Sequence, residues 1–337
     1  MCARLRGCLS HALAAAKFRK CRQLAPMKAY LKKSRLYPPL RFLYHQVVPE
    51  PHSRPPVLET LLYRPFSALE KARYVQGRGS TAGLVLPHFL GIGGMQSGTS
   101  WLWFYLGHHP QIYVPDVKEL QYFSWRYHRS LRYYSRQFEA HADKIRGEIS
   151  TEYSFLPLER IRFLRAIAPE VRLFFILRDP IDRAWSHAKQ ELLFRTHRKY
   201  EEVREFEFIR RFRHPNTRHY SNCLRDIDNW LSVYPREQLY VGVYDDIVRC
   251  PERLLTDVFR HIGVSTDVDF STFPIQEVFR GGEKTPPMPA KYREVLEEMY
   301  ADMIEELYRR YGEPVAHWRC KPALPEATSV PAVETQR

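Results

Sequence analysis

The chain has 337 residues, of which 44% are hydrophobic and 14% aromatic, and it carries a formal net charge of +14. This length and composition suffice for one large packed core or two small ones. No stretch reaches the roughly 18 apolar residues that span a bilayer, so the sequence predicts no transmembrane helix. The six cysteines form neither a CxxC pair nor a cluster with zinc spacing. We interpret them as free thiols in a reducing compartment and expect no metal.

The excess positive charge lies mainly in the N-terminal arm, where eleven basic residues precede Glu50, the first acidic residue. Six prolines between residues 38 and 56 interrupt any long element, so residues 1–83 are expected to form an irregular basic extension. Such an arm can contact anionic lipid as an interfacial helix, or bind polyanions; the alternative is a solvated, partly ordered extension. The sequence shows no signature of a nucleic-acid-binding fold, and we expect no nucleic-acid partner.

From residue 84 onward, strand-like and helix-like segments alternate. LVLPHFLGIG at 84–93 is an apolar run that ends in glycine and predicts a buried strand. A helix should follow, with Thr99 or Ser100 as its N-cap and its end between Gly107 and Pro110. Further strands are expected in KIRGEIS, VRLFFIL and QLYVGV, and further helices at 158–169, 181–194 and 290–312. The tail at 321–337 is rich in proline, alanine and threonine and is expected to be disordered.

This alternation predicts an α/β fold with a parallel central sheet flanked by helices on both faces. Ligands of such sheets bind beyond the carboxyl ends of the strands, at the point where the strand order reverses. The loops after 84–93 and after 171–177 each follow a predicted strand. We therefore interpret the two loops as parts of one site.

The first loop, GIGGMQSGTSWL at 91–102, is typical of a phosphate-binding loop. Its glycines let the backbone approach an anion closely. The hydroxyls of Ser97, Thr99 and Ser100 lie at a helix start, where the helix dipole favours negative charge. It is not a Walker loop, because Thr99 follows Gly98 in place of a lysine. The alternative is a tight strand–helix turn whose glycines serve packing.

The second loop lies in LRDPIDRAWSHAKQEL, which combines a helix start with two anion-binding side chains. Asp179 can cap the helix, and the proline after it suits the first helical position. Arg178 is thereby left at the strand end, facing the cleft, and Ser186 follows on the helix. A guanidinium and a hydroxyl suit a terminal phosphate. The alternative for Arg178 is a surface salt bridge with Asp179 or Asp182.

Taken together, these segments resemble the sulfotransferase family. GMQSGTSWL is similar to the family's 5′-phosphosulfate loop, whose usual forms are like PKSGTTWL and QKAGTTWL. LRDPIDRAWSHAKQEL is similar to its 3′-phosphate motif, with Arg and Ser eight residues apart. HHPQIYVPDVKELQYFS resembles the segment of glycan-type and bacterial members that contains the acidic catalytic residue. GEISTEYS and PREQLYVGVYDDI resemble further segments, so the resemblance extends from Phe89 to Tyr311.

The resemblance implies a sulfotransferase domain at 84–320 with a P-loop-like phosphate-binding loop. The donor would be 3′-phosphoadenosine 5′-phosphosulfate (PAPS), used without a metal. Glu119 would be the general base that takes a proton from the acceptor. Core packing is the alternative role for Trp101. For Arg280 and Lys284, the alternative is a surface turn without a binding role. The implied donor-binding residues are Ser97, Gly98, Thr99, Ser100, Trp101, Arg178, Ser186, Arg280 and Lys284.

Gln96 occupies the place of the family's loop lysine, which supplies positive charge next to the bridging oxygen of the donor. A glutamine donates a neutral hydrogen bond, and losing one electrostatic donor typically costs about 10²–10³ in rate. Three explanations are open. Another cation reaches that oxygen, with Lys118 the nearest candidate in sequence and Arg178 the second. Otherwise the enzyme is slow, or the site binds the nucleotide without turning it over. The candidate catalytic residues are therefore Glu119, Lys118 and Gln96.

The sequence thus predicts a PAPS-dependent sulfotransferase that acts on a hydroxyl or amine of a glycan, glycolipid or small metabolite. We expect a cytoplasmic protein. Whether its basic arm contacts the inner membrane surface peripherally is left open by the sequence. A PAPS- or 3′,5′-bisphosphate-binding protein with weak or lost catalysis is the alternative. A P-loop kinase is disfavoured by the missing lysine. We expect structural roles for His108 and His109. His187 is disfavoured as the catalytic base, because it points about 100° round the helix from Ser186.

Overall fold

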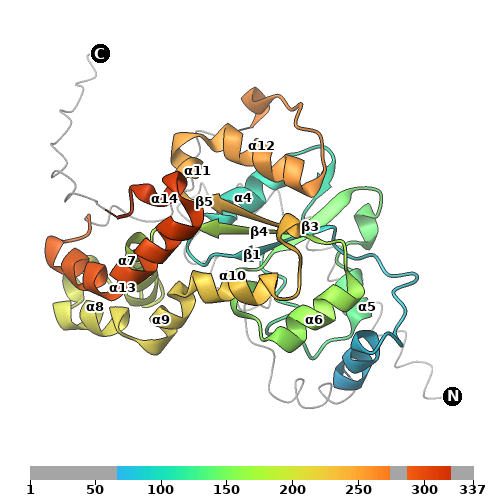
Figure 1. Cartoon of the computed structure of the whole chain (residues 1–337), viewed down its shortest axis with the longest axis horizontal. Coiled ribbons are helices and arrows are strands. Elements are labelled where there is room, and N and C mark those ends of the chain that lie inside the picture. Colours follow the sequence, from blue (N-terminus) through green and yellow to red (C-terminus); the bar gives the residue numbers. More distant parts are fainter. Residues whose placement is uncertain (1–66, 274–286, 320–337) are drawn as a thin grey trace, which may run out of the picture. The chain divides into compact units, whose positions relative to one another are not determined.

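The computed structural model describes residues 67–273 and 287–319. In this part of the chain, five strands form one sheet in the order β2-β3-β1-β4-β5, and all neighbouring strands are parallel. The predicted α/β fold with a parallel sheet is confirmed (Figure 1). The strands are β1 Phe89–Gly93, β2 Ile112–Tyr113, β3 Ile145–Ile149, β4 Arg172–Leu177 and β5 Leu239–Val243.

Successive side chains of β4 enter two separate hydrophobic cores. Leu173, Phe175 and Leu177 belong to one cluster, and Phe174 and Ile176 belong to the other. This period of two is what a strand that is buried on both faces requires. The second cluster is completed by helices α4 Thr99–Leu106 and α12 Pro251–Ile262, and the first by α6 Leu158–Ile167, α7 Pro180–Lys189, α10 Cys223–Leu231 and α13 Ala290–Tyr311 (Figure 1).

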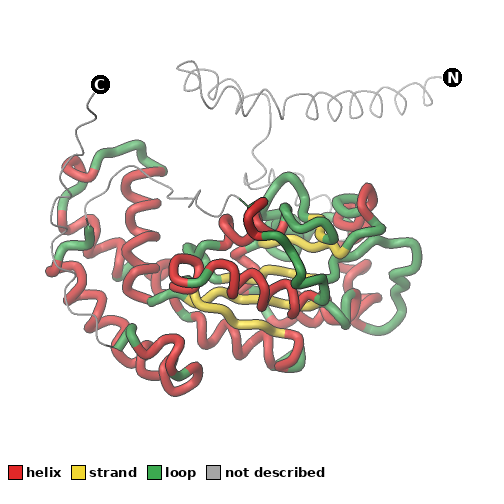
Figure 2. The backbone as a smooth tube through the Cα atoms, turned by 90° about the horizontal axis from the view of Figure 1, so that it is seen from above, coloured by secondary structure: helices red, strands yellow, loops and turns green. Residues whose placement is uncertain are grey.

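The strand order reverses around β1, which lies between β3 and β4. From β1 the chain runs through α4 to β2 and β3 on one side, and then crosses to β4 and β5 on the other. Figure 2 shows the strands lying between layers of helices. The loop after β1 therefore lies at the switch point of the sheet, where open α/β folds bind ligands.

Shorter elements complete the part of the fold that the structure describes. A π-helical turn, Gln190–Phe194, continues α7, so the helix predicted at 181–194 changes its winding after Lys189. The long predicted helix near the C-terminus is confirmed as α13, and Gly312 caps it with φ 69°. The short helices are α5 Leu131–Ser135, α8 Glu205–Phe212, α9 Pro215–Ser221, α11 Asp245–Arg249 and α14 Glu313–Ala316.

The prediction of irregular chain up to residue 83 is wrong for residues 67–75, which form a helix. Ser67 Oγ donates to the carbonyl of Tyr127 at 2.9 Å, and Lys71 Nζ donates to the carbonyl of Arg129 at 2.9 Å. This helix therefore packs on the domain. The six prolines that predicted irregular chain end at Pro56, and no proline lies between residues 67 and 75, so nothing in this stretch interrupts a helix. The basic arm before residue 67, the tail at 321–337, and Arg280 and Lys284 lie outside the described residues.

Candidate active site

The loop after β1 leads directly into α4, and Gly98 makes the turn. Gly98 has φ 74°, and a Cβ there would lie 2.3 Å from Ile247 Cδ1, so both conformation and space require glycine. The helix begins at Thr99 with Gly98 as its N-cap, and the predicted N-caps Thr99 and Ser100 are wrong. Within the described residues no side chain caps α4, and its first turn holds no acidic residue. Its first N–H groups therefore face outward as donors for an anion.

The other glycines of this loop pack against β4. A Cβ on Gly91 would lie 2.5 Å from Phe174 Cε2, and a Cβ on Gly93 would lie 2.7 Å from Phe175 Cε2. The packing alternative therefore accounts for these two glycines. It leaves the free N-terminus of α4 as the feature of the loop that favours an anion.

Gln96 connects the two predicted motifs. Ser186 Oγ donates to Gln96 Oε1 at 3.0 Å, and Arg178 Nη1 donates to the main-chain oxygen of Gln96 at 2.5 Å. The Gln96 amide donates in turn to Gln190 Oε1, at the start of the π-helical turn. The structure thus brings together the loop after β1 and the motif after β4, as their positions at strand ends predict.

The Arg178 guanidinium contacts an aromatic ring in addition to Gln96. The group lies 4.2 Å from the ring centroid of Tyr244, and its buried Nε has no hydrogen-bond partner within the described ranges. Burial, and then the charge of Arg178, lower the pKa of Lys189, so positive charge gathers here. The two carboxylates considered as salt-bridge partners of Arg178 have other contacts. Asp179 Oδ1 accepts from Ile181 N at 2.8 Å, which is the helix cap that the sequence predicts. Asp182 Oδ1 lies 3.9 Å from Arg293 Nη2.

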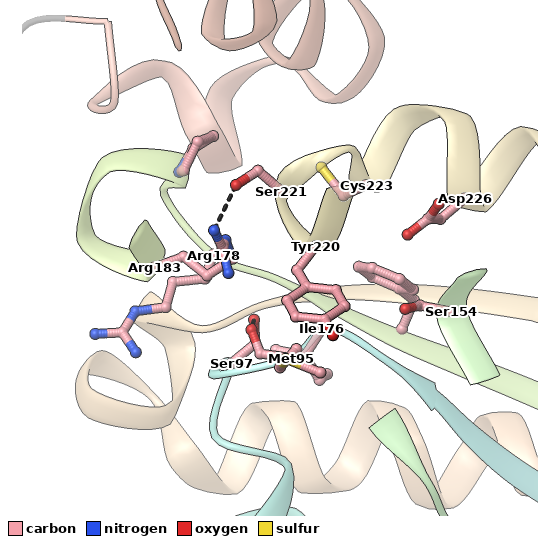
Figure 3. Close-up of a pocket in the computed structure, with 13 residues that line it drawn as sticks. Met95, Ser97, Ser154, Ile176, Arg178, Arg183, Tyr220, Ser221, Cys223 and Asp226 are labelled. Atoms are coloured by element: carbon pink, nitrogen blue, oxygen red, sulfur yellow. Dashed lines mark hydrogen bonds between the residues drawn. The ribbon is translucent and has the colours of Figure 1, made fainter. Parts of the chain in front are cut away.

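A small cavity separates the first loop from α9 and α10 (Figure 3). Its volume is about 10 Å³, which is room for about one water molecule. Ser97 and Arg178 line it together with Arg183, whose Nη2 donates to the carbonyl of Thr217 at 3.2 Å and to Ser221 Oγ. Burial lowers the pKa of Arg183. The cavity thus places a second arginine of the second motif, Arg183, near the first loop.

Glu119 lies against the C-terminal end of β3. Its N–H donates to the carbonyl of Ile149 at 3.1 Å. Its carboxylate accepts from Thr151 N at 2.9 Å, from Thr151 Oγ1 at 3.2 Å and from Gln121 Nε2 at 2.9 Å, and it pairs with Lys118. The Glu119 side chain is 13% exposed. The carboxylate is therefore fixed and largely covered, rather than solvated as a simple partner of Lys118.

The segment of Glu119 adjoins the same sheet edge as the first loop. β3 pairs in parallel with β1, and beyond the pair Ser150 N donates to the carbonyl of Gly91 at 3.0 Å. Lys118, considered as the replacement cation, is paired with Glu119. Arg178, the second candidate, already contacts Gln96.

The histidines have structural contacts. His108 Nδ1 lies 2.8 Å from the carbonyl of Phe104, and His109 Nε2 lies 2.9 Å from the carbonyl of Ser265, which confirms the structural roles predicted for them. Burial, followed by nearby arginines, lowers the pKa of His187 to about 3. Trp101 is 3% exposed and belongs to the second hydrophobic cluster, which is what the packing alternative expects.

The spacing places Gln190 on the same general helix face as Asp182 and Ser186, and the structure adds its contact with Gln96. One functional candidate was missed by sequence reasoning. Glu148 is 1% exposed in β3, and burial raises its pKa to about 7. An acidic residue inside a predicted strand was the available signal for Glu148.

The described residues hold no group of three or more histidine, cysteine, aspartate or glutamate side chains arranged for a metal ion. None of the helices in the described part of the chain has both the length and the apolar character of a membrane span.

Known proteins resemble this chain in sequence and in structure. The model of the Sulfotransferase family matches residues 121–268, which contain Arg178 and Ser186 and begin two residues after Glu119. The membrane-associated sulfotransferase kil1 of Dictyostelium discoideum is 23% identical over 312 residues, covering 67% of this chain and 65% of kil1. The bifunctional heparan sulfate N-deacetylase/N-sulfotransferase 4 of Mus musculus is 26% identical over 278 residues, covering 69% of this chain. The chain spans 31% of that second relative's length.

A solved structure agrees with these matches. The crystal structure of a sulfotransferase from Alicyclobacillus acidocaldarius superposes with a TM-score of 0.54 and 25% sequence identity. The superposition covers 70% of this chain and 99% of the bacterial one. The family model, the curated relatives and the solved structure together support a sulfotransferase family domain in this chain.

Proposed function

We propose that the protein transfers a sulfuryl group from PAPS to a hydroxyl or amine of a glycan-type acceptor. The observation that carries this proposal is the convergence of Arg178 and Ser186 on Gln96. It makes one continuous polar surface from the two motifs that would hold the two phosphate ends of the donor. An ATP site needs no such second phosphate-binding motif.

The donor would lie across this surface with its 5′-phosphate at the start of α4. The first N–H groups of α4, with Ser97 and Ser100 beside them, would bind that phosphate. Arg178 and Ser186 would exchange Gln96 for the 3′-phosphate as their hydrogen-bond partner. A guanidinium forms charge-assisted bonds with phosphate, and these are stronger than its bond to a neutral carbonyl.

Glu119 would accept the proton of the attacking hydroxyl or amine. Its carboxylate is held by Thr151 and Gln121 in one orientation, which is what general-base catalysis requires. The sulfuryl group would then pass in line to the acceptor, and adenosine 3′,5′-bisphosphate would leave. Gln96 would donate a neutral hydrogen bond to the leaving oxygen where a lysine would supply a charge.

The acceptor class rests on the relatives. One of them is named for heparan sulfate N-sulfation, and a saccharide amine or hydroxyl suits a carboxylate base. Another is named as membrane-associated, and the basic arm of this chain suits an anionic membrane surface. If the arm does bind membranes, deleting residues 1–50 will abolish sedimentation with vesicles that contain anionic lipid. Unchanged sedimentation would remove the membrane part of the proposal.

Transfer of labelled sulfate from PAPS to N-deacetylated heparan sulfate tests the activity, with the N-acetylated polysaccharide and a panel of sugar alcohols as further acceptors. We expect transfer by the wild type that is lost in Glu119→Gln. Binding of the donor without transfer to any of these acceptors would favour the second candidate, a nucleotide-binding protein with lost catalysis. The specific observation that favours that candidate is the uncharged Gln96 at the centre of the two motifs.

A further inference from the structure

Four consecutive backbone N–H groups directly after Glu119 all find acceptors in one buried cluster. Leu120 N donates to Glu148 Oε2 at 3.2 Å, and Gln121 N donates to Ser150 Oγ at 3.1 Å. Tyr153 Oη accepts from the N–H groups of the next two residues, 122 and 123, at 2.8 and 3.3 Å. The loop that carries Glu119 is therefore fixed through its main chain.

Every acceptor in this cluster is either Glu148 itself or a hydroxyl group that donates a hydrogen bond to Glu148. Ser150 Oγ donates to Glu148 Oε2 at 2.6 Å, and Tyr153 Oη donates to Glu148 Oε1 at 2.6 Å. A hydroxyl has one proton, so each of these groups, by donating to Glu148, turns its lone pairs toward the loop. Tyr134 Oη is the fourth donor to the carboxylate, at 3.1 Å. Four donors match the four lone-pair directions of an ionised carboxylate.

Among the residues that the structure describes, the neighbours of Glu148 supply hydrogen bonds and no countercharge. Tyr134 comes from α5, Tyr153 from the 3-10 turn after β3, and no ion pair of Glu148 occurs among the described residues. Burial raises the pKa of Glu148 to about 7, although its hydrogen bonds act in the opposite direction, and the charge of Glu119 raises it further. The group therefore changes its charge near neutral pH.

The backbone beside Glu148 adopts an unfavourable conformation that these bonds maintain. Glu119 and Gln121, on either side of Leu120, have φ values of 65° and 55°. Residues other than glycine hold such values only where their surroundings enforce them. The Leu120 bond to Glu148 and the Ser150 bond to Gln121 are two of the contacts that enforce them here.

We propose that Glu148 is a positioning residue whose ionised carboxylate orders residues 120–123 and thereby fixes Glu119 at the sheet edge. The ordering of the loop does not require an acceptor substrate. That it positions a catalytic base rests on the proposed function. A protonated carboxyl must donate one hydrogen bond, and the Leu120 N–H cannot reverse its role to accept it. The loop is therefore ordered above the pKa of Glu148 and loosens as the pH falls below it.

Hydrogen exchange of the amides of residues 120–123, corrected for intrinsic rates and measured between pH 5.5 and 8.5, tests this proposal. Wild-type protection should fall about tenfold as the pH decreases through about 7, the effect of losing a charge-assisted hydrogen bond. Glu148→Gln should show low protection at every pH with no midpoint. Asp226→Asn is the matched control, because Asp226 is equally buried but bonds to Arg225 on α10.

Tyr153→Phe provides a second variant if Glu148→Gln fails to fold. It deletes the acceptor for residues 122 and 123, so their protection should fall while that of Leu120 persists. Wild-type protection that is flat between pH 6 and 8, or Glu148→Gln protection equal to the wild type, would overturn the proposal. Binding of adenosine 3′,5′-bisphosphate to Glu148→Gln should match the wild type. Failure of the wild type to bind it would contradict the proposed function and leave the exchange result standing.

Discussion

Ser186 Oγ donates a hydrogen bond to Gln96 Oε1 at 3.0 Å, which ties the helix after β4 to the loop after β1. The residue that stands in the place of the family's loop lysine thus contacts the motif expected to bind the other end of the donor. A lysine carries no acceptor and could not form this bond. If Gln96 takes the place of the loop lysine, as we propose, this chain has a contact between the two loops where a lysine would supply a catalytic charge.

Ser186→Ala tests the assignment of the 3′-phosphate. The variant should bind adenosine 3′,5′-bisphosphate about tenfold more weakly, because it loses one hydrogen bond to a charged group. Its affinity for adenosine 5′-monophosphate should not change, since that ligand lacks the 3′-phosphate. Parallel titrations with the two nucleotides measure the difference, and an equal loss for both would contradict the assignment.

Gln96→Lys restores the charge that the loop lacks. The transfer rate should rise about 10²-fold, because a cation beside the leaving oxygen stabilises the transition state. Gln96→Met, of similar length but unable to donate or carry charge, is the control and should be no faster than the wild type. Single-turnover measurement with labelled PAPS gives the rate. An unchanged rate in Gln96→Lys would mean that another cation already acts at that oxygen.

Glu119→Gln should lower the transfer rate by about 10²–10⁴, the usual contribution of a general base. Affinity for the bisphosphate should stay at the wild-type value, because the described contacts of Glu119 are with Lys118, Thr151 and Gln121 and include none of the proposed donor-binding residues that the structure describes. Glu139→Gln, at an exposed carboxylate of the same segment of chain, is the control. Equal rates for wild type and Glu119→Gln would show that a different group takes the proton.

The pKa of Glu148 also predicts how the free energy of unfolding depends on pH. A carboxyl whose folded pKa of about 7 lies above its usual 4.5 keeps its proton in the folded state where the unfolded chain has lost it. Stability therefore falls as the pH rises from about 4.5 to about 7, on the order of 3 kcal/mol for this group.

Urea unfolding at pH 5 and pH 8 measures this dependence. The difference between the two values should be smaller in Glu148→Gln than in the wild type by that amount. Asp226, whose pKa is raised to about 6 by burial, contributes to both proteins equally and cancels in the comparison. An identical pH dependence in the two proteins would show that Glu148 titrates at an ordinary pH.

Gly98→Ala should destabilise the fold by more than Gly263→Ala. Both glycines have positive φ, 74° and 82°, so each alanine pays about 1–2 kcal/mol for the left-handed conformation. Only at Gly98 would the new Cβ overlap a neighbour, Ile247 at 2.3 Å, which adds about 1–3 kcal/mol. Thermal unfolding of the two variants compares them, and equal losses would argue against tight packing of this turn.

Much of the fold could be predicted from the sequence because its strands are short apolar runs bounded by glycine or charged residues. β4 and the helix after it followed from VRLFFILRDP, where Asp179 and a proline mark the helix start. The helix at 67–75 could not be predicted, because its stability depends on contacts with Tyr127 and Arg129 that are distant in sequence.

The candidate site was predicted in its parts but not in its connections. Arg178 and Ser186 were identified from spacing, and Glu119 from resemblance. The bond between Ser186 and Gln96 was not foreseen, because a glutamine carries no sequence signal for a partner 90 residues away. Glu148 was missed because strand periodicity does not reveal which buried polar group finds donors on other elements.

Calorimetric titration of adenosine 3′,5′-bisphosphate into the wild type, Arg178→Ala and Arg172→Ala tests the central claim most directly. Arg172 lies at the opposite end of the same strand and serves as a control for charge and folding. The donor site proposed here predicts binding to the wild type and to Arg172→Ala, and a loss of about 10–100-fold in Arg178→Ala. Absence of binding to the folded wild type, or equal affinities in the two variants, would contradict it.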